Sequence, residues 1–222
     1  MVLNATIIDF LKTLSKNNNR EWFQENKTWY NDAREKFELF VNVMIAEISK
    51  FDPAVKTISA KESIYRIYRD TRFSNDKTPY KTNFGAHIVQ NGRKSGLAGY
   101  YLHIEPGGYF TGGGIYMPAS PVLKTVRNEI YDNTEEFKTI LNNKEFKKHF
   151  PTIQGEKLKK APKDFPNDFE DVDLLKYKNY TLLEELDENL LFTKEFLPKI
   201  ITSFKLMYPF NQYINRAILE YE

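Results

Sequence analysis

The sequence predicts an α+β fold, with a central antiparallel sheet over about residues 63–117 covered by helices from both ends of the chain. Apolar residues recur every three or four positions at both ends, whereas the middle third alternates with a period of two. Glycine-containing turns at residues 91–92 and 106–108 separate the alternating runs. Because the helical and strand patterns are segregated along the chain, α+β is favoured over α/β.

Two helices are expected before the sheet, over residues 6–15 and about 20–50, each with its apolar side chains on one face. Asn18 followed three residues later by Glu21 has the form of a helix start. In that form the amide side chain accepts from free backbone N–H groups and the carboxylate reaches back to the cap residue. We therefore expect Asn18 to begin the longer helix.

Alternating runs predict four strands, the first beside a meander of the other three, at residues 63–68, 83–90, 97–105 and 109–117. Regular pairing would place Tyr101, His103 and Glu105 on one face of their strand. Should His87 share that face, two imidazoles and a carboxylate would offer the ligand types of a metal site. Hydrogen-bonded structural histidines explain the same pattern, so we assign no metal.

Helical patterns return after the sheet. They fall at about residues 120–130, 134–141, 144–149 and 193–221. Pro209 is expected to kink or split the last helix, because proline lacks a backbone donor and clashes with the preceding turn. Residues 152–180 are the least regular segment, with a short helix begun by Leu174 and Leu175.

Composition limits the classes of function. A chain of 222 residues fits one domain spanning residues 1–222. It contains no cysteine, which excludes disulfides, thiolate nucleophiles and cysteine-based metal sites. No apolar run approaches a membrane span and no signal-peptide pattern is present, so a cytoplasmic protein is expected. A net charge of +2 gives little reason to expect a nucleic-acid partner.

The stretch over residues 64–87 is dense in arginine, lysine and aromatic residues. Lys61 to Asn83 holds six lysines and arginines against three aspartates and glutamates, which makes the rest of the chain nearly neutral. Arginine can hold a phosphate or carboxylate with two parallel hydrogen bonds. The predicted ligand-binding residues are Arg66, Arg69, Arg72, Lys77, Lys81 and His103.

Three residues of the same region are candidate catalytic groups. Asp70 could orient an arginine or act as a base, and Tyr80 and His87 could donate protons. A purely structural interpretation is also open, in which Asp70 and Asp76 are ion-pair partners of the arginines around a turn.

The motifs RIYRDTRFSNDKTPYKTNFGAHI and AGYYLHIEPGGYFTGGGIYMP resemble a widespread family of bacterial and fungal hypothetical proteins, a domain of unknown function. The resemblance extends from the first helix to the last and implies no activity. The chain departs from the family pattern at Asp164, where glycine is usual, and at Phe169-Glu170, where histidine-proline is usual. These departures make a functional role for that loop doubtful.

No phosphate-binding loop, nucleophile elbow, zinc-protease or dinucleotide motif is present, and no motif names a cofactor. The sequence therefore favours binding of, or catalysis on, a small anionic compound that bears phosphate or carboxylate. The alternative is a non-catalytic interaction module for a protein or nucleic-acid partner. Binding to a nucleic acid would weaken steeply as the salt concentration rises.

Overall fold

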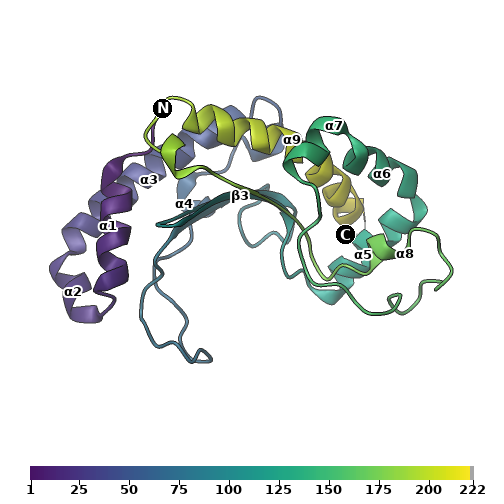
Figure 1. Ribbon diagram of the computed structural model, residues 1–222, viewed down its shortest axis with the longest axis horizontal. Helices are drawn as coiled ribbons and strands as arrows, with labels where there is room; N and C mark the ends of the chain where they lie inside the picture. The colour runs from purple at the N-terminus through teal and green to yellow at the C-terminus, as the bar shows by residue number, and fades with distance from the viewer. Residues whose placement is uncertain (221–222) are drawn as a thin grey trace.

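The computed structural model describes residues 1–220 and confirms the α+β class (Figure 1). Its antiparallel sheet has the strand order β1-β2-β3-β4. The strands are β1 Phe84–Ile88, β2 Gly99–Glu105, β3 Gly108–Ile115 and β4 Tyr180–Glu185. The first three form the predicted meander. Strand β4 was not predicted, because it begins at the end of the irregular segment 152–180 and lies far from the other strands in sequence.

The N-terminal helices are α1 Ala5–Lys16, α2 Arg20–Glu25, α3 Lys27–Ile48 and α4 Ala60–Ser63, with a 3-10 turn at Pro53–Val55. The prediction of one helix over 20–50 was wrong. The chain breaks at Asn26, whose φ of −102° and ψ of 19° are outside the helical range. Its backbone N–H closes α2 on the Trp22 carbonyl, and α3 starts at the next residue.

The assignment of Asn18 as the helix cap was also wrong. Asn19 caps α2, its side chain accepting from the Trp22 N–H at 2.9 Å. Asn18 instead binds both backbone groups of Tyr80, donating to the carbonyl at 2.9 Å and accepting from the N–H at 3.1 Å. Asn18 thus ties the arginine-rich stretch to the N-terminal helices.

The predicted strand over residues 63–68 is replaced by the end of α4 and two isolated bridges, Ile64 with Ala86 and Tyr68 with Tyr80. A helical turn forms first because Ser59 and Glu62 make a reciprocal capping box. The Ser59 N–H donates to Glu62 Oε2 at 2.9 Å. The segment that follows still lies beside β1, as its bridge to Ala86 shows.

The C-terminal helices are α5 Ser120–Asp132, α6 Thr134–Asn142, α7 Lys144–His149, α8 Val172–Leu175 and α9 Phe196–Glu220, with a 3-10 turn at Glu188–Leu190. Helix α9 includes Pro209 and is not split there. The expected end of this helix at residue 221 lies outside the described residues. No helix within residues 1–220 is long and apolar enough to cross a membrane.

Helices α3 and α9 cover one face of the sheet (Figure 1). A Cβ atom at Gly113 would lie 2.7 Å from the sulfur of Met207, so the glycine allows α9 to approach β3 closely. Asn211 of α9 accepts from the Gly114 N–H at 2.8 Å and donates to the Gly99 carbonyl at 3.0 Å. Asn215 makes the equivalent pair with Ala98. The helix therefore supplies hydrogen bonds at the edge of the sheet where β2 begins and β3 ends.

Asp164 has a φ of 78°, in the left-handed region that favours glycine. Its exposed ion pair with Lys124, at 2.9 Å, contributes at most about 1 kcal/mol. Asp164→Gly should raise the free energy of unfolding by about 0.5–1 kcal/mol, because left-handed backbone costs an L-residue roughly 1–2 kcal/mol. Urea denaturation measures the change.

Asp168→Gly is the matched control, since Asp168 is exposed and has no positive φ. That substitution should lower the free energy of unfolding slightly, because glycine increases the conformational entropy of the unfolded chain. Equal effects at the two positions would contradict a strained backbone at Asp164.

Candidate functional site

The second face of the sheet faces away from α3 and α9 (Figure 1). Strand register puts Gly85 opposite His103 and His87 opposite Tyr101, so the two histidines lie on this same face. Gly112 and then Leu183 continue the row that begins with His87 and Tyr101. Leu183 is 36% exposed, which marks the face as open at β4. We call this surface the open face.

Residues 66–81, which we call the arginine hairpin, extend from the open-face side of the sheet (Figure 1). The Arg69 N–H donates to the Pro79 carbonyl at 3.0 Å, and the Lys81 N–H donates to the Ile67 carbonyl at 2.8 Å. These two bonds pair the arms of the hairpin and leave residues 70–78 as its tip.

The charged side chains of the tip bind one another. Asp70 accepts from Arg72 at 2.9 and 2.7 Å, which lowers the pKa of its carboxyl group to about 2. Asp76 accepts from the Thr78 N–H and from Arg69, which together lower its pKa to about 2. Arg69 and Arg72 therefore each have an acidic partner.

Lys77 and Tyr80 also lie away from the open face. The ammonium group of Lys77 donates to the Thr71 carbonyl at 3.0 Å. Tyr80 is 3% exposed and its ring stacks on Phe23, with centroids 3.9 Å apart. Burial is the main cause that raises the pKa of its phenol. Because successive residues of an extended segment point to opposite sides, anchoring Tyr80 in the core directs Lys81 the other way.

Two cations, Lys81 and Arg93, lie over the Tyr65 ring at the β1 edge of the open face, and Arg66 is close enough to lower the pKa of Lys81 and also that of Asp70. The Lys81 ammonium lies 5.2 Å from the centre of the Tyr65 ring and the Arg93 guanidinium 4.9 Å from it. Burial, together with the positive charges of Arg66 and Arg93, lowers the pKa of Lys81. We call Arg66, Lys81 and Arg93 the cation cluster.

No member of the cation cluster forms an ion pair with an aspartate or glutamate within residues 1–220. Arg93 donates to the backbone carbonyl of Glu62 at 2.7 Å, while the Glu62 carboxylate is occupied by Ser59. Arg93 was missed by the sequence reasoning because it lies outside the arginine-rich stretch. Its position just after the Asn91-Gly92 turn, which folds back beside residues 62–65, was the available signal.

A chain of hydrogen bonds crosses the open face beside the cation cluster. The Tyr101 hydroxyl is 2.9 Å from His103 Nδ1, and His103 Nε2 is 3.0 Å from Glu105 Oε2. Thr82 donates to the other oxygen of Glu105. Burial tends to raise the pKa of Glu105, but the hydrogen bonds from Thr82 and His103 outweigh it and the pKa is lowered.

The positions of the protons in this hydrogen-bond chain follow from Tyr101 at one end and Glu105 at the other. Burial raises the pKa of Tyr101 well above its usual range, so the phenol keeps its proton and donates it to Nδ1. His103 then carries its own proton on Nε2 and donates to the Glu105 carboxylate. The arrangement can relay a proton: as the phenol oxygen accepts one, its own passes to His103, and Glu105 would stabilise the resulting imidazolium.

Two glycines fix the rings on the open face. A Cβ atom at Gly85 would lie 2.5 Å from the Tyr101 hydroxyl oxygen, so the Tyr101 ring rests on β1. A Cβ atom at Gly99 would lie 2.7 Å from His87 Nε2, so the imidazole rests on β2. Burial and the charge of Arg93 lower the pKa of His87 to about 4, and the ring is neutral at pH 7.

The structure thus brings three of the residues predicted from sequence to the open face, namely Lys81, His87 and His103, and exposes Arg66 within electrostatic reach of Lys81. It does not bring there the residues of the hairpin tip or core, namely Asp70, Tyr80, Arg69, Arg72 and Lys77. No group of three or more histidine, aspartate and glutamate side chains in the described part of the chain could hold a metal ion.

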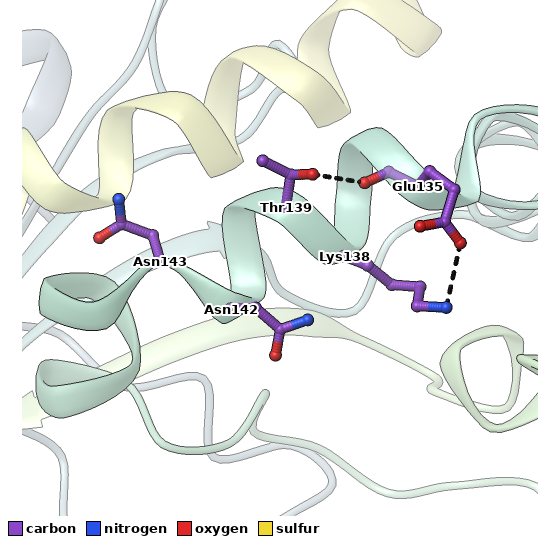
Figure 2. Close-up of a pocket in the computed structure, with 5 residues that line it drawn as sticks. All are labelled: Glu135, Lys138, Thr139, Asn142 and Asn143. Atoms are coloured by element: carbon purple, nitrogen blue, oxygen red, sulfur yellow. Dashed lines mark hydrogen bonds and ion pairs between the residues drawn. The ribbon is translucent and has the colours of Figure 1, made fainter.

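Two hollows lie elsewhere on the surface of the described residues. One lies behind the arginine hairpin and is lined by Ser15, Asn18, Arg69, Asp76, Thr78, Tyr80 and Thr82. The other lies along α6, far from the hairpin (Figures 1 and 2). In this hollow Lys138 pairs with Glu135, their nitrogen and oxygen 3.0 Å apart, and the Thr139 hydroxyl donates to the Glu135 carbonyl, as the dashed lines of Figure 2 mark. Neither hollow presents a cation without a partner.

Fold and site together define an α+β protein whose antiparallel sheet leaves one face open beside a cluster of unpaired cations. The family model described as conserved hypothetical protein (DUF2461) matches residues 6–213, and the chain belongs to this family. No curated protein and no solved structure matches the chain.

Gly85→Ala should force the Tyr101 ring off β1 and break its hydrogen bond to His103. Overpacking of this kind costs about 1–3 kcal/mol of unfolding free energy, which urea denaturation measures. Gly108→Ala is the control, since a Cβ atom there meets nothing within 4 Å. Equal stability of the two variants would contradict the close contact of Tyr101 with Gly85.

Stability should fall as the pH is lowered from about 6.5 to about 4. In that window the unfolded chain protonates His87 while the folded chain, with a pKa of about 4, does not. The unfolded state then binds more protons, so the free energy of unfolding decreases as pH falls, by on the order of 3 kcal/mol for a shift of this size.

His87→Gln should remove this contribution, leaving a flatter profile in urea denaturation series. Carboxylates contribute equally to both proteins and cancel in the comparison. Parallel profiles for the wild type and the variant would show that His87 titrates normally in the folded state.

Proposed function

We propose that this protein binds a small anionic compound, bearing phosphate or carboxylate, at the cation cluster on the β1 edge of the open face. The observation that carries the proposal is that Arg66, Lys81 and Arg93 form no ion pair with an aspartate or glutamate within residues 1–220, although burial and mutual repulsion lower the pKa of Lys81 and only Arg66 feels the more distant charge of Asp70. Like charges held together destabilise the protein, and a bound anion would offset that cost.

The cluster offers two kinds of contact to an anion. Arg66 and Arg93 can donate two parallel hydrogen bonds each, and Lys81 adds a point charge. Neutral His87 lies within the electrostatic reach of Arg93 and is available as a further donor or acceptor. We also propose that the protein is cytoplasmic, as the sequence leads us to expect.

Catalysis on the bound anion is the stronger form of the proposal. The hydrogen-bond chain Tyr101, His103 and Glu105 supports it, because a tyrosine backed by a histidine and a carboxylate can accept a proton from a substrate while passing its own to the imidazole. The negative charge left on the substrate would lie beside the cation cluster.

An interaction module for a protein partner is the second candidate. Phe73 at the hairpin tip is 94% exposed, and the Arg72 guanidinium lies 5.6 Å from the centre of its ring. Exposed aromatic and arginine residues are enriched where proteins meet. Phe73→Ala should abolish partner capture in this alternative and leave anion binding unchanged.

The anion proposal predicts that inorganic phosphate raises the melting temperature of the wild type in a saturable manner, because it binds the folded state. Lys81→Met should weaken binding by about tenfold or more, the equivalent of a charge-assisted hydrogen bond. Thermal-shift titrations with phosphate and citrate measure the effect.

Lys77→Met is the matched control, since Lys77 lies on the hairpin tip and binds a backbone carbonyl. It should titrate like the wild type. Loss of the phosphate effect in both variants, or in neither, would contradict an anion site at the cation cluster.

A further inference from the structure

A row of aromatic rings leads from the cation cluster across the open face. The centre of the Tyr65 ring, which lies between Lys81 and Arg93, is 6.2 Å from that of Tyr101. Tyr101 is 5.7 Å from Phe110 on β3, and Phe110 stacks on His103 at 4.5 Å with an angle of 13°. The row therefore spans three neighbouring segments of the sheet surface.

The row lies low on the sheet because glycines surround it. The Tyr101 ring rests on Gly85 of β1, and its partner on β3 is Gly112. The next residue across, Leu183 of β4, is 36% exposed. The residue between Tyr101 and Leu183 is Gly112, so no side chain of this row stands between the Tyr101 ring and β4.

The cation cluster lies at one end of this row of aromatic rings. Three cations that form no ion pair within residues 1–220 match the double negative charge of a phosphate monoester better than the single charge of a carboxylate. Aromatic side chains on an open sheet stack planar rings, and each stacked base contributes about 1–3 kcal/mol. One ligand can use both features only if it joins a phosphate to a flat ring.

We infer that the anion bound at the cation cluster carries a planar ring that packs against the Tyr101 and Phe110 rings, which makes the ligand a nucleoside monophosphate or a compound of that class. This inference rests on the proposed anion site and adds the chemical class of its ligand. The phosphate lies at Arg66, Lys81 and Arg93, and the ring extends towards β3.

The test compares adenosine monophosphate with ribose 5-phosphate by isothermal titration calorimetry on the full chain. Both carry the phosphate and the sugar, and only the first carries a base. The expected result is a dissociation constant at least about tenfold lower for adenosine monophosphate, as one stacked base supplies. Adenosine, which lacks the phosphate, should bind more weakly than either.

Phe110→Leu should remove most of the advantage of the base and leave the dissociation constant of ribose 5-phosphate unchanged, which also shows that the variant is folded. Phe73→Leu is the matched control because that ring lies exposed on the hairpin tip. If Phe110→Leu does not fold, Tyr101→Leu is the second variant and should give the same loss of base discrimination.

Equal dissociation constants for adenosine monophosphate and ribose 5-phosphate would overturn the inference while the anion site stands. Absence of binding by either phosphate would overturn the anion site and the inference together. A single-stranded oligoadenylate that binds far more tightly than the monophosphate, with a steep loss of affinity in salt, would also overturn it by making the ligand a nucleic acid.

Discussion

Helix α9 lies so close to β3 that Gly113 has room for no side chain beside Met207. Two buried asparagines of the same helix, Asn211 and Asn215, bind backbone groups of Gly99, Gly114 and Ala98. Buried polar groups left unpaired cost about 1–3 kcal/mol each, so this contact fixes the helix on the sheet. The face covered by α9 and α3 is thereby closed to ligands, and the opposite face is left open.

The distribution of charge on that opposite side follows from the arginine hairpin. Asp70 and Asp76 neutralise Arg72 and Arg69 at the exposed tip, which leaves the arms to carry the unpaired cations. Asn18 and Phe23 hold Tyr80 in the core, and the alternation of the chain then sets Lys81 on the open face. Tyr80, which the sequence suggested as a proton donor, instead anchors the chain so that its neighbour Lys81 can bind the ligand.

The α+β class and the meander were predictable because each depends on local periodicity and on turns. The shared face of His87 and His103 could only be posed as a condition, because it depends on the register of β1 against β2. The break at Asn26 and the helical turn at Ser59 were not, since a hydrogen-bonding side chain there outweighs the apolar pattern. The cation cluster was only half predictable. Arg66 and Lys81 were identified, but Arg93 joins them through a fold that brings residues distant in sequence together.

The central claim is that the anion site lies at Arg66, Lys81 and Arg93 rather than at the hairpin tip. A phosphate titration followed by backbone amide chemical shifts tests it most directly. The account predicts saturable shifts at residues 65–66, 81, 87 and 93, with residues 70–78 unchanged. Shifts confined to the tip, around Arg69 and Arg72, would contradict it.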